Sequence, residues 1–179
     1  MARIGYGYGS EWHLLRWMGR YRNDLIKKIR EVTNKPNSKI DFLDFHFNPS
    51  EKWPDSELKG IEFLLMDHSA NRAWEIFWPQ SGNIPNWDAV GKITDILGEE
   101  WLLVEAKAHS EELISNCGGK EHGGLPIIRK AFQTTINQLG ITANVSSWLK
   151  PYYQYANHLS FLSFLHSQDI PSHLLNIYF

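Results

Sequence analysis

The apolar run from Trp101 to Ala108 constrains the fold most, because it is the strongest strand signal in the chain and carries Glu105 and Lys107 near its end. Alternate residues of a strand share a face, so Leu103, Glu105 and Lys107 are expected to point the same way. A carboxylate and an ammonium among apolar neighbours are costly to desolvate unless they are paired or bound to a metal. The run therefore predicts both a strand and a polar site on it.

A second carboxylate is expected beside this pair. Residues Trp87 to Ile93 form a predicted strand that contains Asp88, and a short connection with Asp95 and Gly98 leads from it into the run at Trp101. Two strands joined so closely predict a hairpin, which brings Asp88 near Glu105. Two carboxylates at one point suit a hard divalent cation, Mg²⁺ or Mn²⁺, which keeps several waters for a substrate phosphate.

This combination of groups is suited to phosphodiester hydrolysis. A bound divalent ion lowers the pKa of a water ligand and neutralises charge on the scissile phosphate. The Lys107 ammonium would orient the attacking water or stabilise charge that develops in the transition state, a role we favour over that of a general base.

The arrangement resembles the PD-(D/E)XK nuclease superfamily, in which an acidic residue on one strand is followed by Glu/Asp-X-Lys on the next. The matching residues are Asp88 and then Glu105-Ala106-Lys107. The resemblance implies an α/β domain with a restriction-endonuclease-like core, a central mixed β-sheet flanked by helices. It also implies that Asp88 and Glu105 hold the metal and that Lys107 takes part in catalysis.

Two looser resemblances add accessory residues. Members of this superfamily often carry an acidic residue on a helix ahead of the core strands, and Glu11 is the matching candidate here. Exonuclease-type members have a helix with Gln and Tyr before a late strand, which resembles the segment containing Gln154. Glu11 also suits a helix N-terminus through the macrodipole, and Gln154 is equally explained as an ordinary polar helix residue. The resemblance covers roughly residues 87–179; residues 40–85 match no pattern, and Asp88 lacks the nominal preceding Pro.

Periodicity predicts the remaining elements of what we expect to be a single nuclease-like domain over residues 1–179. A basic amphipathic helix is expected over about residues 10–33, with Ser10 as its N-cap, and the core motif strands over about residues 86–109. Further strands are predicted at 41–47 and 174–179, and helices near 55–66, 69–78, 125–139 and 152–166, with a short one from Ser110. The final apolar run either closes the sheet or marks a C-terminal truncation.

Charge is distributed unevenly although the net charge is only -2. Residues 1–39 contain nine Lys or Arg against three Asp or Glu, whereas the remainder contains nine against seventeen. A phosphate-facing edge beside an acidic metal site explains this asymmetry, and so does a solvated helix face. The expected partner is nucleic acid, with DNA preferred over RNA, and the expected assemblies include a homodimer.

Composition and the lack of apolar runs narrow the expected cellular location. The single Cys117 cannot form an internal disulfide, no apolar signal stretch opens the chain, and no apolar run approaches the roughly 18 residues of a membrane helix. We therefore expect a cytoplasmic protein without membrane partners. His109, Cys117 and His122 do not have the spacing of a compact zinc site.

Other functions remain open at this stage. The main alternative is a noncatalytic nucleic-acid-binding or protein-interaction module on the same fold, since a scaffold does not fix an activity. A hydrolase acting on a small phosphorylated substrate is a third. A purely structural interpretation of the three residues is also open: Glu105 and Lys107 form a simple surface pair on an edge strand, and Asp88 caps or braces the preceding loop.

Overall fold

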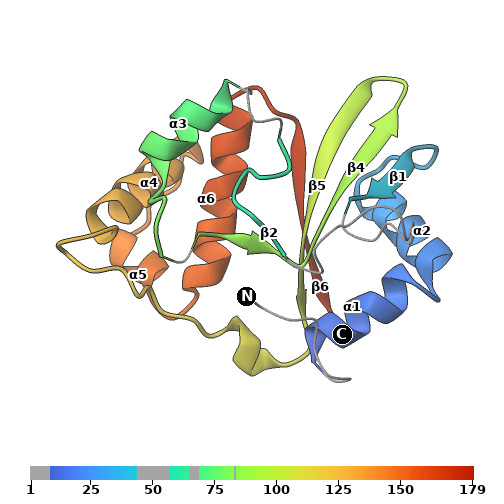
Figure 1. Cartoon of the computed structure of the whole chain (residues 1–179), viewed down its shortest axis with the longest axis horizontal. Coiled ribbons are helices and arrows are strands. Elements are labelled where there is room, and N and C mark those ends of the chain that lie inside the picture. The colour runs from blue at the N-terminus through green and yellow to red at the C-terminus, as the bar shows by residue number, and fades with distance from the viewer. Residues whose placement is uncertain (1–8, 44–56, 65–68, 83) are drawn as a thin grey trace. The chain divides into compact units, whose positions relative to one another are not determined.

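The computed structural model describes residues 9–43, 57–64, 69–82 and 84–179 (Figure 1). The chain divides into two compact units, each built from separate stretches of sequence. Unit 1 contains Met1–Glu57, Trp87–His109 and Pro171–Phe179, and unit 2 contains Leu58–Asn86 and Ser110–Ile170. The expectation of one domain over the whole chain stays a prediction.

Unit 1 is organised around a four-stranded mixed sheet, which confirms the predicted mixed α/β architecture. Its strand order is β1-β4-β5-β6. β1, β4 and β5 pair antiparallel, whereas β6 lies parallel to β5, so that β5 has a partner on each edge. The strands are β1 (Lys39–Phe42), β4 (Ala89–Asp95), β5 (Gly98–Lys107) and β6 (Ser172–Tyr178). The predicted β4–β5 hairpin and the late strand are thus both present.

Two helices, α1 (Ser10–Met18) and α2 (Arg22–Val32), pack against this sheet (Figure 1). Their apolar stripes and one face of the strands form a common core. It contains Leu14, Met18, Leu25, Ile29, Ile40, Phe42, Ala89, Ile93, Leu102, Val104 and Ala106, with Leu175 and Ile177 packed against it. Burial of this apolar surface fixes which face of each strand points towards the helices.

The prediction of a single basic helix over residues 10–33 is wrong, because the first helix ends at Met18 and a second begins at Arg22. Gly19 ends α1, with its amide donating to the Leu15 carbonyl at 2.8 Å, and α2 begins at Arg22. Glycine is a poor helix former, so the helix ends there even though the apolar stripe continues beyond it. Ser10 is the first helical residue and Gly9 the N-cap, which corrects the predicted cap.

Three further predictions differ from the structure or extend beyond its described residues. The strand predicted from Trp87 is interrupted at Asp88: β3 (Asn86–Trp87) pairs with β2 (Leu58–Lys59), and β4 starts only at Ala89. No helix forms over residues 57–64, where Gly60 takes a left-handed φ of 49° that ends the strand in a turn. The strand expected at 41–47 is β1, which ends at Phe42; residues 44–47 lie outside the described ranges.

Unit 2 is mostly helical, with an aromatic core. Its helices are α3 (Ala70–Phe77), α4 (Leu125–Gln138), α5 (Val145–Leu149) and α6 (Tyr153–Ser167), with a 3₁₀ turn at Ser110–Leu113. The predicted helices near 69–78, 125–139 and 152–166 are confirmed, whereas α5 was not predicted. Trp74 lies at the centre of the core, 4.9 Å from the Phe161 ring and 5.3 Å from the Phe164 ring. Within the described residues, no helix is long and apolar enough to cross a membrane.

A stability prediction follows from the close approach of β1 and β4. A Cβ on Gly91 would lie 2.9 Å from the main-chain oxygen of Asp41, so Gly91→Ala must push the two strands apart. We expect the free energy of unfolding, measured by urea denaturation, to fall by about 1–3 kcal/mol. The control is Gly118→Ala, where an added Cβ meets no atom within 4 Å. An equal loss in both variants would contradict this account of Gly91.

Candidate metal and catalytic site

The described backbone holds Asp88 directly against β5. The β4–β5 register pairs Ala89 with Val104, and extending it by one residue places Asp88 opposite Glu105. The Asp88 amide donates to the Val104 carbonyl at 3.0 Å, and its carboxylate Oδ2 accepts from the Ala106 amide at 2.6 Å. The two acidic residues predicted from sequence are therefore neighbours on adjacent segments of chain.

Glu105 and Lys107 occupy the face of β5 that points away from the α1 and α2 core. Leu102, Val104 and Ala106 belong to that core, so the alternate residues face the opposite side. Glu105 is only 4% exposed, and its Oε1 accepts a hydrogen bond from the Lys107 ammonium in an ion pair. The side-chain exposure of Lys107 is 15%, so this is a largely buried pair and not one on the open surface of an edge strand.

Burial shifts both carboxyl groups towards their neutral forms. Desolvation raises the pKa of Asp88 to about 6, against the opposing effects of the Ala106 amide and of Lys107. Desolvation and then the nearby charge of Asp88 raise the pKa of Glu105 to about 8, although Lys107 acts in the opposite direction. Near neutral pH the pair thus resists carrying two negative charges without a further cation.

Two more carboxylates contribute to the same negative field. Glu11 and Glu57 both raise the pKa of Asp88, and Glu57 also raises the pKa of Glu105. Glu11 lies in the first turn of α1, where it is favourable to the helix N-terminus as well, so the two interpretations of this residue are compatible. The carboxylates together outnumber Lys107, the cation that pairs with Glu105.

The parallel β5–β6 pairing adds Asn176. It lies in register with Glu105, and because its neighbours Leu175 and Ile177 pack against the core, Asn176 shares the Glu105 face of the sheet. An amide here offers both a donor and an acceptor next to the acidic pair. The end of β6 is held to β5 by the Phe179 amide, which donates to the Lys107 carbonyl at 2.9 Å.

The predicted site residues do not all belong to one unit. Asp88, Glu105, Lys107 and Glu11 all belong to unit 1, whereas Gln154 lies on α6 of unit 2. The main-chain amide of Gln154 donates to the Ser115 hydroxyl at 2.8 Å within that unit, a contact that does not involve the Gln154 side chain. The assignment of Gln154 to the site therefore stays a prediction.

The residues present fit a magnesium-type ion. Across the described ranges, no group of three or more His, Cys, Asp or Glu side chains is arranged to hold a metal ion. Mg²⁺ does not require such a cage, since it is commonly held by one or two carboxylates and keeps its other ligands as water. Asp88 and Glu105 supply that number of carboxylates, with an excess of negative charge around them.

Sequence reasoning missed Glu57 and Asn176 for different reasons. Glu57 lies in a segment that was predicted as a helix near 55–66 and that matches no family pattern, so nothing in the sequence indicates that it reaches the acidic pair. Asn176 is recognisable in the sequence as a lone polar residue between Leu175 and Ile177. Its neighbour on the adjacent strand could not be predicted, because the strand order was not known.

No family model, no curated protein and no solved structure matches this chain.

The raised carboxyl pKa values give a testable pH dependence. Between about pH 4 and pH 8 the folded chain binds more protons at these groups than the unfolded chain, so its free energy of unfolding must fall as pH rises. The part due to Asp88 is on the order of 3 kcal/mol. We expect Asp88→Asn to flatten the fall, measured by urea denaturation in EDTA.

Asp41→Asn is the matched control, because Asp41 is an exposed aspartate whose partner is the surface residue Lys39. Flattening of the same size in both variants, or a parent whose stability does not change over this range, would argue against buried acidic groups at this site.

Proposed function

We propose that the protein is a metal-dependent nuclease that hydrolyses phosphodiester bonds, with DNA preferred over RNA. The observation that carries the proposal is that Asp88 and Glu105 lie side by side on adjacent segments of chain, Glu105 buried and Asp88 partly buried, with Lys107 paired to Glu105. Two neighbouring carboxylates that are partly or fully removed from water lower stability unless a cation offsets their charge. A divalent ion would offset this charge, and binding such an ion is a function that explains why the two carboxylates lie together.

In this proposal Asp88 and Glu105 hold Mg²⁺ or Mn²⁺. Glu11 and Glu57 strengthen the negative potential that draws the ion in, because both lie within electrostatic reach of Asp88. The bound ion would supply a water of lowered pKa and neutralise charge on the phosphate. The Ala106 amide restrains the Asp88 carboxylate, so that one ligand is positioned before any metal arrives.

Lys107 would act electrostatically. Its ammonium is held by Glu105, which places a positive charge next to the acidic pair without the cost of ordering a free lysine side chain. From there it can orient the attacking water or stabilise negative charge on a phosphate oxygen. Asn176, on the same face, can donate a hydrogen bond to substrate.

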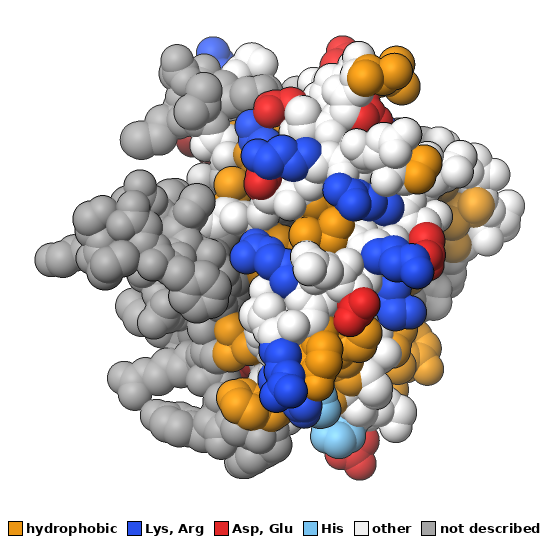
Figure 2. Space-filling model, turned by 90° about the vertical axis from the view of Figure 1, so that its right-hand side faces the viewer, with side chains coloured by type: hydrophobic (Ala, Val, Ile, Leu, Met, Phe, Trp, Pro, Cys, Tyr) orange, Lys and Arg blue, Asp and Glu red, His pale blue; other side chains and the backbone are white. Residues whose placement is uncertain are grey.

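A basic surface on α1 and α2 supports a polyanionic substrate. Figure 2 shows several Lys and Arg side chains spread over the side of the molecule that carries these helices in Figure 1. The exposed members are Arg16, Arg20, Lys27 and Lys28. None of them forms an ion pair with a described residue. Glu11 and Arg16 lie along one helix, with Arg20 just beyond its end, so a strand bound near the acidic site has cations available next to it.

The second candidate is a noncatalytic nucleic-acid-binding module. The same basic surface favours it, since Arg16, Arg20, Lys27 and Lys28 can bind phosphates whether or not the acidic pair loads a metal. The two functions differ in what divalent metal does: it is required for cleavage but not for electrostatic binding.

Cleavage of labelled single- and double-stranded DNA and RNA tests the proposal. With Mg²⁺ or Mn²⁺ we expect the parent to cut, EDTA to abolish cutting, and Lys107→Ala to lower the rate by roughly a hundredfold or more through loss of transition-state stabilisation. The matched control is Lys92→Ala, another strand lysine paired with a glutamate, Glu99, at 2.8 Å. Lys92→Ala should keep the parental rate.

Binding without cleavage by a folded parent, under every metal condition, would favour the module. If Lys92→Ala reduced activity as much as Lys107→Ala, the role given to Lys107 would be wrong.

The basic surface gives a separate prediction about affinity. In EDTA, replacing both Arg16 and Arg20 by Ala should weaken DNA binding and lower the slope of log affinity against log salt by up to about 2, since each phosphate that is no longer neutralised accounts for about 0.9. Fluorescence anisotropy over a range of salt concentrations measures both quantities. Lys39→Ala, which removes an exposed lysine already paired with Asp41 at 2.7 Å, should change neither. An unchanged slope in the double variant would show that Arg16 and Arg20 are not part of the DNA-binding surface.

A further inference from the structure

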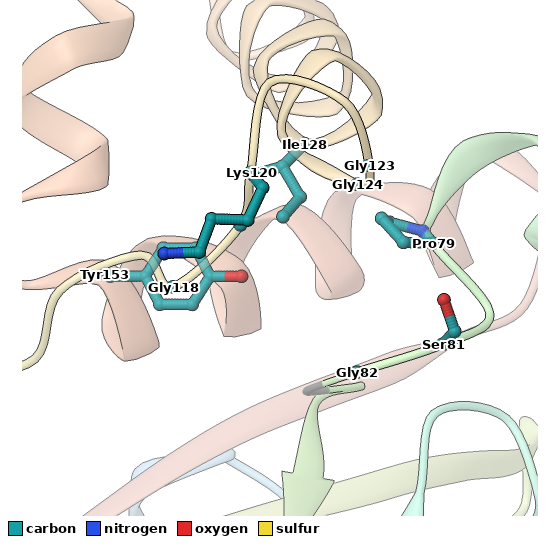
Figure 3. A pocket seen from close by; sticks show the side chains of 10 residues that line it. Pro79, Ser81, Gly82, Gly118, Lys120, Gly123, Gly124, Ile128 and Tyr153 are labelled. Carbon is teal, nitrogen blue, oxygen red and sulfur yellow. The ribbon is translucent and has the colours of Figure 1, made fainter.

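Unit 2 contains a pocket of about 270 Å³ (Figure 3). Two loops form most of its wall: the segment from Pro79 to Gly82, which follows α3, and the glycine-rich segment 118–124, which precedes α4. Ile128 of α4 and Tyr153 of α6 complete it. All the lining residues belong to unit 2, so the pocket shares no residue with the acidic site of unit 1.

Glycines let the two loops meet closely. A Cβ on Gly124 would lie 2.9 Å from Pro79 Cγ, and one on Gly119 would lie 3.3 Å from both Cys117 Sγ and Ile128 Cδ1. Side chains at these positions would push the walls apart. Glycine backbone also leaves its amides uncovered, which allows a ligand oxygen to approach the main chain.

The charge of the pocket is positive. Lys120 is its one cationic lining residue, and no acidic residue is among the described side chains that line it. Glu121, next in sequence, is held by Arg129 in two contacts of 2.7 and 2.8 Å. Lys120 itself forms no ion pair within the described part of the chain. The ammonium is therefore available to an anion.

Polar donors and an apolar wall complete the lining. Figure 3 shows the Lys120 ammonium extending towards Tyr153, whereas the Ser81 hydroxyl lies on the other loop, across the same space. Burial raises the pKa of Tyr153, with Cys117 beside its hydroxyl, so the phenol stays neutral and does not repel an anion. The Tyr153 ring and the Ile128 side chain offer apolar surface to a part of the ligand without charge.

We propose that this pocket binds a small phosphate monoester, with the phosphate at Lys120 and the organic part against Tyr153 and Ile128. Phosphate is favoured over carboxylate because it has more acceptor oxygens, which suit the Lys120 ammonium together with main-chain amides of the glycine-rich segment 118–124. The volume, just below the roughly 300 Å³ at which drug-sized pockets begin, restricts the ligand to a small one. This site goes beyond the proposed nuclease function and does not depend on it.

Titration calorimetry with phenyl phosphate, in EDTA and at constant ionic strength, tests the proposal on the full chain. Phenyl phosphate should bind the parent more tightly than inorganic phosphate does. Lys120→Ala should weaken binding by roughly tenfold or more, because a charge-assisted hydrogen bond is removed. Lys130→Ala is the matched control, since Lys130 is another exposed lysine nearby in sequence that does not line the pocket.

Three results would overturn the proposal: no binding by the parent, an equal loss of affinity in Lys130→Ala, or equal affinity for phenyl phosphate and inorganic phosphate. Asp88→Asn should bind phenyl phosphate like the parent. Loss of binding in that variant would place the phosphate at the acidic site and not in this pocket, so the outcome separates this proposal from the nuclease proposal.

Discussion

Strand β5 is hydrogen-bonded along both edges, to β4 on one side and to β6 on the other, and its residues from Leu102 to Ala106 are buried. Because successive side chains point to opposite faces of the sheet, burial of all five residues means that both faces of the strand are covered there. Its apolar residues anchor α1 and α2, while Glu105 and Lys107 must be accommodated on the opposite face. The chemistry available to unit 1 follows from that constraint.

Without a bound cation, the acidic site lowers the stability of the folded chain. Asp88 gains a hydrogen bond from Ala106, and Glu105 gains the Lys107 ammonium, yet desolvation outweighs these contacts and both carboxyl pKa values rise. Groups kept at such a cost are often functional, because the same concentration of negative charge that lowers stability creates affinity for a cation. The geometry thereby links the stability of the sheet to the protonation of two residues.

The two units carry different kinds of surface. Unit 1 places an acidic pair on a sheet and exposed cations on its helices, whereas unit 2 combines a glycine-lined pocket with an aromatic core. Both units are assembled from sequence stretches that are far apart, so neither follows from a simple division of the chain. The basic segment near the N-terminus joins the acidic strands only because the sheet brings them into one unit.

The sequence by itself determined the elements whose signal is local. The apolar period of β5, the hairpin with β4, and the longer helices of unit 2 were predictable because each depends on neighbouring residues, and the nearness of Asp88 to Glu105 followed from the hairpin. Tertiary structure decided the rest. The parallel pairing of β6 with β5 brought Asn176 beside Glu105. Folding also placed Glu57 within electrostatic reach of the acidic pair, and burial of β5 on both faces raised the carboxyl pKa values. These features arise from contacts between residues far apart in the chain. Such contacts exclude water, and the strength of an electrostatic interaction depends on how much water surrounds the charges.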